Sequence, residues 1–442
     1  MAHPAEQRDT HPVDEVLPPG RTLAYGVQHV AAMYAGVVAP PLIIGQAIGM
    51  GPGRMALLLA ASLLTAGLAT VLQSVGLWRV GARLPFVNGV TFGSVAPVLA
   101  IVGQRGQNPL GVVYGSVLVA GALAFLAAPY FSRLVRFFPP LVNGSVITLI
   151  GLSLMPVAAK WVVPAASSGS TGAVALGALT LVLVLLLNRF LRGFAQRVAL
   201  LVALVVGTLV AWPLGFVDTS TFEHAPAFAL PLPFQLATPE FSGTATLSLC
   251  VVMLVAMMES TADMIALGET VGRPVDERTI AAGLRADGAG SALSAVFGGF
   301  TCSAFAQNIG LVALTRVRSR FVVAAAGGLL VLLGLFPAVG AAVSLVPKPV
   351  LGGAALVLFG SVAVSGIRTL GQADLSDPFN ALVVAGTLGV GLVPVVAPDF
   401  YASFPAAART VLDSGISAGC LTALALNLLF NSRRRSTQDP AG

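Results

Sequence analysis

Long apolar runs, each of about twenty residues, recur along most of the 442-residue chain and alternate with short polar segments. At about 1.5 Å of rise per residue, twenty helical residues cover a hydrocarbon core of about 30 Å. Taken in order, the runs predict about fourteen spans, so we expect an all-α polytopic membrane protein. The unbroken runs lie near Leu23–Ile44, Met55–Val75, Leu110–Ala128, Leu141–Ala158, Val174–Leu191, Val198–Phe216, Leu247–Leu267, Thr279–Phe297, Phe321–Val343, Leu351–Ile367, Ala381–Val396 and Val411–Leu429.

The third and tenth runs are too broken for one continuous helix. The third, at residues 82–103, holds two prolines and several glycines, and the tenth, at 297–317, begins with a Gly-Gly pair. Each predicts a short strand followed by a short helix, the helices beginning near Phe92 and Gln307. Each broken run is the third of seven spans, and because seven is an odd number the two halves would cross the membrane in opposite orientations. The pattern therefore predicts a 7+7 inverted repeat with its binding site at these interruptions.

Three acidic residues interrupt otherwise apolar spans. Glu259 and Asp263 lie one helical turn apart on one face of the eighth span, and Asp287 lies in the ninth. A carboxylate in mid-membrane costs about 2.5–3.5 kcal/mol on insertion scales and marks a buried binding or coupling site. The alternative is a helix that ends earlier, with Asp263 and Glu269 in water. His29, deep in the first span, is either a ligand contact or a hydrogen-bonded core residue.

The composition agrees with a membrane protein, because 56% of residues are hydrophobic and only 10% are charged. The net charge of +6 does not indicate nucleic-acid binding, since the cations follow the loops. Loops on one side of the predicted membrane, together with both termini, hold 19 of the 24 Lys and Arg residues. This bias predicts that both termini lie in the cytoplasm. We expect the chain in the cell membrane, the inner or plasma membrane.

Four stretches resemble the nucleobase–ascorbate transporter family, whose members include xanthine, urate and uracil permeases. They are QHVAAMYAG at 28–36, TFGSVAP at 91–97, MMESTAD at 257–263 and AQNIGLVALTRVRSR at 306–320. The most specific is Gln307-Asn308-x-Gly310-x-x-x-x-Thr315-Arg316, which fits the family signature. The resemblance extends from about residue 20 to 432.

The resemblance implies core and gate domains, a homodimer and an elevator-like motion, with the strands of the third and tenth spans paired between the halves. The core would comprise residues 21–128 and 246–345, and the gate residues 129–245 and 346–431. Residues 1–20 and 432–442 would be cytoplasmic tails.

Site residues carry over by motif. The resemblance implies that substrate is bound by Glu259, Gln307, Phe92, Thr91, His29 and Ala306, and that coupling or support comes from Asp263, Asp287, Asn308, Gly310, Thr315 and Arg316. Glu259 matches the glutamate that holds the nucleobase, and Gln307 matches a residue that also binds it and helps to set selectivity. Phe92 matches the aromatic residue that stacks on the nucleobase ring. His29 matches a residue that supports the site's geometry.

The chemistry of these side chains suits a flat heterocycle. A carboxylate at Glu259 accepts two N–H bonds, Gln307 offers both donors and an acceptor, and Phe92 covers a ring face. We therefore expect import of a purine, xanthine or urate, by proton symport, without a metal or cofactor. Glu259 or Asp263 would carry the proton. Sodium coupling and a pyrimidine substrate stay open.

Two other classes are less well supported. An intramembrane enzyme would need a nucleophile and a base, but the G-x-S-x-G match at Gly415–Gly419 has no histidine after it. We therefore do not expect an enzyme. An anion transporter of the same fold is opposed by Glu259, whose negative charge would repel an anion.

Overall fold

The computed structural model describes residues 11–103, 108–134, 139–163, 171–217, 228, 230–338, 342 and 345–435. Among these, eight helices are long and apolar enough to cross a membrane, and four shorter apolar helices accompany them. The eight are α1 Pro19–Ala47, α2 Pro52–Val75, α4 Pro109–Leu134, α5 Pro140–Val162, α6 Thr171–Phe190, α10 Gly243–Val271, α15 Lys348–Leu370 and α16 Pro378–Val396. The shorter ones include α8 Ala199–Ala211, α13 Arg320–Gly334 and α18 Gly415–Arg435, and the fourth begins at Phe92. A further long helix is α11 Glu277–Phe297.

The two broken runs form the predicted strand-and-helix segments. The first contains β1 Asn88–Val90, the 3₁₀ turn η2 Phe92–Ser94 and α3 Val95–Gly103; the second contains β2 Cys302–Ala304 and α12 Ala306–Thr315. Three further short helices are η1 Pro12–Asp14, α7 Phe194–Arg197 and α17 Ala406–Leu412.

Local sequence signals set many of the helix ends. Prolines open α1, α2, α4, α5 and α16, where the missing N–H is not needed by the helix. Gly272 and Gly298 end α10 and α11 in the left-handed region, with φ of 76° and 91°.

Several expected spans differ from the structure at their boundaries, and two of them show why. The eleventh was expected to reach Val343, which lies outside the described residues; α13 ends at Gly334, shortly before Pro337, which disfavours helix in the residue before it. The fourteenth was expected from Val411, but Val411 belongs to α17, and α18 begins at Gly415. The hydroxyl of Ser414 accepts a hydrogen bond from the backbone nitrogen of Ser417 there, which explains the new start.

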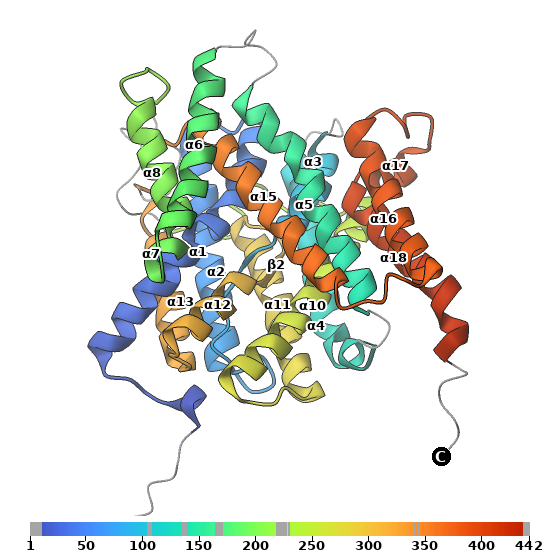
Figure 1. Cartoon of the computed structure of the whole chain (residues 1–442), viewed down its shortest axis with the longest axis horizontal. Helices are drawn as coiled ribbons and strands as arrows, with labels where there is room; N and C mark the ends of the chain where they lie inside the picture. The colour runs from blue at the N-terminus through green and yellow to red at the C-terminus, as the bar shows by residue number, and fades with distance from the viewer. Residues whose placement is uncertain are drawn as a thin grey trace, which may run out of the picture.

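The helices pack in two sets around the paired strands. In one set α2 packs on α13, α11 on α4, α1 on α13 and α10 on α4; in the other α5 packs on α15, α6 on α15, α16 on α5 and α16 on α18. Figure 1 shows α15 and α5 running beside each other, with α16 and α18 along one side and α6 and α8 along the other. The beginning of α1 and the end of α18 lie at the same end of the molecule (Figure 1).

Candidate functional site

The two short strands pair with each other in the middle of the bundle. β1 and β2 are antiparallel, with Asn88 opposite Ala304 and Val90 opposite Cys302. The ladder extends beyond the strands, because Thr91 N donates to Thr301 O at 2.9 Å and Phe305 N to Val87 O at 3.0 Å. A helical turn begins immediately after each strand, so η2 and α12 begin at opposite ends of the antiparallel ladder.

One hydroxyl group anchors the first residue of each strand. Thr70 on α2 donates to Asn88 O at 3.2 Å and accepts from Asn88 N at 3.0 Å. Ser291 on α11 does the same for Cys302, accepting from its nitrogen at 2.9 Å and donating to its oxygen at 3.4 Å. These bonds satisfy backbone groups that a three-residue strand leaves unpaired in an apolar interior.

A cavity of about 240 Å³ lies beside the strand pair. It is lined by Val90, Thr91, Phe92, Gly93, Ile147, Ile150, Glu259, Ser303, Ala304, Phe305, Ser361, Val362 and Ser365. These residues come from the two interrupted segments, α5, α10 and α15. Among the described residues of this lining, Glu259 is the only ionisable side chain, so the cavity combines one carboxylate with hydroxyl groups and apolar walls.

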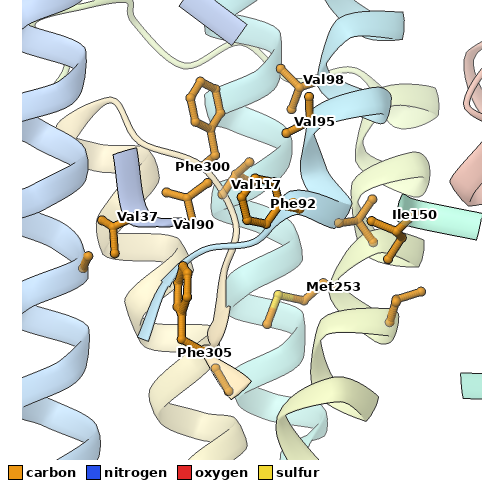
Figure 2. Close-up of a cluster of buried hydrophobic side chains, with 14 of the residues drawn as sticks. Val37, Val90, Phe92, Val95, Val98, Val117, Ile150, Met253, Phe300 and Phe305 are labelled. Carbon is orange, nitrogen blue, oxygen red and sulfur yellow. The ribbon is translucent and has the colours of Figure 1, made fainter. Parts of the chain in front are cut away.

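The cavity's aromatic walls come from both broken segments. Phe92, only 8% exposed, meets Phe359 of α15 edge to face, with ring centroids 5.9 Å apart and an interplanar angle of 77°. Phe305, which follows β2, lies close to Gly36 and Gly89, where an added Cβ would fall 2.8 Å and 2.4 Å from its ring atoms. Figure 2 shows Phe92 and Phe305 beside the paired strands, with Ile150 across from Phe92.

Asp263 lies one turn beyond Glu259, outside the cavity lining. The helix continues to Val271, about two turns further, so Asp263 is not at a helix end; Glu269, in the last turn, is exposed. One carboxylate oxygen of Asp263 is buried without a hydrogen-bond partner among the described residues. Asp263 and Glu259 therefore lie on the same face of α10, one helical turn apart.

Asp287 connects three elements rather than lining the cavity. It is fully buried, and its Oδ1 accepts hydrogen bonds from Asn88 Nδ2 and from Gln73 Nε2, the latter at 3.3 Å. Gln73 Oε1 in turn accepts from Ala82 N at 2.9 Å. This network holds α11, α2 and β1 together, so Asp287 supports the strand that leads to Phe92.

His29 and Asn308 form a second supporting contact. Asn308 Nδ2 donates to Pro85 O at 3.0 Å, so its Oδ1 is the acceptor of the bond from His29 Nδ1. His29 is 2% exposed and is not in the cavity lining. The pair joins α1 to α12 and to the segment before β1. In the structure His29 is thus a buried residue that is hydrogen-bonded to Asn308.

The rest of the signature extends away from the cavity along α12. The side chains of Ala306 and Gln307 lie outside the part of the chain that the structure describes, but their backbone forms the first turn of α12, next to Phe305. Gly310 lies in the body of α12. Thr315 and Arg316 end that helix. The Thr315 hydroxyl bonds to Leu311 O at 2.9 Å, and Arg316 is exposed with φ of 57°.

Sequence reasoning did not single out several residues of this site. They are Thr70, Gln73, Asn88, Ser260, Ser291, Phe305, Ser361 and Ser365. Asn88 offered a signal, because it is an amide inside a glycine-broken apolar run. The hydroxyl residues offered none, since a serine or threonine in a membrane helix usually bonds only to its own helix.

A second cavity, of about 600 Å³, adjoins the first. The two share Phe305 and Ser361 in their linings. The larger one lies between α1 and the helices α6, α8 and α15, and it includes Gly193 and Gln196 of the α6–α8 connection. It separates the two packing sets, as expected for a vestibule to the smaller cavity.

Comparison with known proteins identifies a family model and several relatives that match this chain. Residues 20–400 match the model of a group described as "Permease family". The uric acid transporter UacT of Escherichia coli is 38% identical over 434 residues, covering 96% of this chain and 89% of its own. The uric acid permease PucJ of Bacillus subtilis is 38% identical over 421 residues (93% of each chain), and the xanthine permease of the same organism 37% over 415 residues (93% and 94%).

Two solved structures share the fold at low sequence identity. The transmembrane domain of a cyanobacterium bicarbonate transporter, BicA, has a TM-score of 0.62 at 16% identity and covers 94% of this chain and 99% of its own. The overall structure of SLC26A9 has a TM-score of 0.54 at 13% identity, covering 92% and 69%. At these identities the likeness concerns the fold alone.

Proposed function

Because this chain belongs to the nucleobase–ascorbate transporter family of permeases, we propose that it is a secondary active transporter that imports a purine, xanthine or urate. The observation that carries the proposal is the cavity of about 240 Å³ that presents Glu259 and Phe92 beside the amino ends of two half-helices. Relatives that are uric acid and xanthine permeases favour a purine over the pyrimidine alternative.

The cavity's chemistry fits the recognition of such a ring. Drug-sized ligands occupy pockets of about 300–1,000 Å³, so this smaller space suits a compact flat molecule. Glu259 would accept ring N–H donors, and Phe92 would cover one face of the ring. The first turn of α12, which carries Ala306 and Gln307, would supply further hydrogen bonds. Its amino-terminal N–H groups favour electron-rich carbonyl oxygens.

We assign the coupled proton to the acids of α10. Asp263 has an unpartnered, buried carboxylate oxygen and lies one turn from the substrate-facing Glu259. A proton on either residue would lower the negative charge that the bundle has to hold when the site is loaded. Proton symport through Asp263 or Glu259 is the primary mechanism, with sodium symport as the alternative.

The helix packing supports an inverted repeat of seven plus seven spans. The second and eleventh spans, α2 and α13, pack together, and so do their counterparts seven spans away, α11 and α4. In the same way, the contact of α6 with α15 corresponds to that of their counterparts, α16 with α5. The glycine crossings follow the same correspondence. A Cβ on Gly67 would lie 2.5 Å from Gly327 O, and one on Gly121 would lie 2.7 Å from Gly288 O. Thr70 on α2 and Ser291 on α11, each of which anchors a strand, likewise lie on corresponding spans.

The two packing sets would be the core and the gate. The core, residues 21–128 and 246–345, carries Glu259 and both broken segments, whereas the gate, 129–245 and 346–431, carries α5 and α15. An elevator-like movement of the core past the gate would carry the cavity across the membrane, with the larger cavity as its inward exit. Both termini would be cytoplasmic. The spans α6 and α16 have the most exposed apolar windows, which makes gate-to-gate homodimerisation in the bilayer the proposed assembly.

Uptake into proteoliposomes tests this function. Labelled urate or xanthine should accumulate when an inward proton gradient is imposed, and uracil should compete weakly. Accumulation driven by a sodium gradient alone would show that sodium, and not a proton, is the coupled ion. Bicarbonate or sulfate uptake without purine uptake would contradict the proposal and favour an anion carrier, the class to which BicA belongs.

A further inference from the structure

Five arginines converge on a cavity far from the substrate site. The cavity, of about 700 Å³, lies between the loop after α2, the end of α4 and the connection from α10 to α11. Its arginines are Arg79, Arg83, Arg273, Arg278 and Arg285, which define the basic cavity. The two acids in its lining, Asp276 and Glu277, leave a formal charge of +3. This is half of the net charge of the whole chain.

Most of this positive charge has no counter-ion among the residues that the structure describes. Among the described residues, Arg273 forms an ion pair with Asp14 at 3.2 Å, whereas the other four arginines form none. Asp276 is engaged at the start of α11, where its carboxylate accepts from Thr279 Oγ1 at 2.6 Å and Thr279 N at 2.8 Å. The hydrogen bond from the Thr279 side chain, followed by that from its backbone, holds the pKa of Asp276 below its usual value.

The loop after α2 has an unusual backbone that fixes its side chains beside the basic cavity. Trp78 and Arg83 have φ of 53° and 55°, in a region that non-glycine residues rarely adopt. Gly81 N donates to Ala282 O at 2.8 Å, which attaches the loop to α11. Non-glycine residues held in this region tend to cluster at ligand sites, because the surrounding structure has to impose the conformation.

The same loop exposes apolar side chains next to the arginines. Trp78 is 83% exposed and Leu77 71% exposed. The Arg79 guanidinium lies 5.4 Å from the centre of the Trp78 ring. An exposed tryptophan at the end of membrane-spanning helices is typical of the headgroup level of a bilayer. A site for a soluble anion would gain nothing from these exposed apolar groups.

We propose that the basic cavity binds the phosphate headgroup of an anionic phospholipid, with Trp78 and Leu77 resting among the adjoining lipids. Guanidinium groups bind phosphate oxygens in a two-pronged geometry, and basic pockets between helix ends on the cytoplasmic side are suited to acidic headgroups. The cavity lies at the end of the molecule that the proposed function assigns to the cytoplasm. The lipid would join the loop after α2 to α4 and α11.

Lipid retention by the purified full-length protein tests this site without any transport reaction. Native mass spectrometry would count phosphatidylglycerol molecules retained from mixed micelles of phosphatidylglycerol and phosphatidylcholine. The double variant Arg83→Gln/Arg278→Gln should weaken binding of phosphatidylglycerol about thirty-fold at low salt, or about fivefold for each arginine. The matched control, Arg189→Gln/Arg368→Gln, removes two exposed arginines outside the cavity, on α6 and α15, and should change binding less than twofold.

Two further measurements distinguish a bound phospholipid from a bound soluble anion. Trp78→Ala should weaken retention of phosphatidylglycerol while leaving the thermal midpoint in phosphatidylcholine unchanged, since the side chain is exposed. Millimolar inorganic phosphate, added without lipid, should raise the thermal midpoint little. A strong rise with phosphate and no preference for phosphatidylglycerol would replace the lipid with a soluble anion. Equal losses in the cavity and control variants would overturn the site, because the surface charge of the whole protein would then be sufficient for the binding.

Discussion

Ser260 on α10 accepts a hydrogen bond from the backbone nitrogen of Ala304 on β2, with 3.1 Å between the two atoms. Ser260 follows Glu259, and Ala304 precedes Phe305, so one bond connects the parts of the chain that carry two cavity-lining side chains. Ser260, which lies outside the cavity lining, therefore sets the position of its neighbour Glu259 relative to the strand pair.

Ser260→Ala should move Glu259 without touching the substrate. The buried Ala304 N–H loses its partner, which costs about 1–3 kcal/mol. We expect a lower thermal midpoint and a higher KM for urate uptake. The matched control is Thr270→Ala on the same helix, because the Thr270 hydroxyl donates to Ala266 O of its own helix. Similar effects in the two variants would show that the contact between α10 and β2 has no special role.

The bond between His29 and Asn308 should appear as a coupling free energy. His29→Ala and Asn308→Ala each leave a buried polar group without its partner, and Asn308→Ala also releases Pro85 O. In a double-mutant cycle on the affinity for urate, residues in contact couple by about 0.5–3 kcal/mol. Strictly additive effects would mean that the pair does not act as one support for α12.

Replacing the ring of Phe92 should weaken binding without collapsing the cavity. Phe92→Leu keeps an apolar wall against Phe359 but removes the flat surface. Base–aromatic stacking contributes about 1–3 kcal/mol per base, so the Kd for urate should rise about fivefold to 150-fold. Phe92→Tyr should restore most of the affinity. An unchanged Kd in Phe92→Leu would place the substrate elsewhere.

Asp263→Asn should preserve substrate binding but abolish coupling to the proton gradient. Asp263 is not in the cavity lining, so we expect urate affinity and exchange of urate across the membrane to persist. Accumulation driven by a proton gradient should be lost, because the side chain no longer takes up a proton. Asp263→Glu, which keeps the carboxyl group, is the matched control. Full gradient-driven accumulation in Asp263→Asn would leave Glu259 as the candidate proton carrier.

The parts of the fold that the sequence predicts well depend on local signals. Prolines and glycines inside an apolar run are visible in a short window, so the strands after Pro85 and Gly299 and the helices near Phe92 and Gln307 were expected where they occur. The boundaries of α13 and α18 were wrong, because hydropathy continues across their ends. Pro337 and the Ser414 hydroxyl decide these ends by backbone geometry and hydrogen bonding.

The candidate site was predicted where a charge stands out against apolar neighbours. Glu259, Asp263 and Asp287 are visible in this way, whereas Thr70 and Ser291 look like ordinary helix hydroxyls. Their partners Asn88 and Cys302 are revealed only when β1 and β2 are brought together. The role of Phe305 likewise depends on Gly36 and Gly89, which are distant in sequence.

Binding of urate and xanthine to purified Glu259→Gln tests the central claim most directly. The substitution keeps the shape of the side chain but removes the charge that would accept the purine N–H groups. Losing a charge-assisted hydrogen bond costs about 1.5–3 kcal/mol, so the Kd should rise about tenfold to 150-fold. Glu269→Gln, at an exposed position in the last turn of α10, should bind like the unaltered protein. An unchanged affinity in Glu259→Gln, with the thermal midpoint preserved, would contradict a substrate site built on this carboxylate.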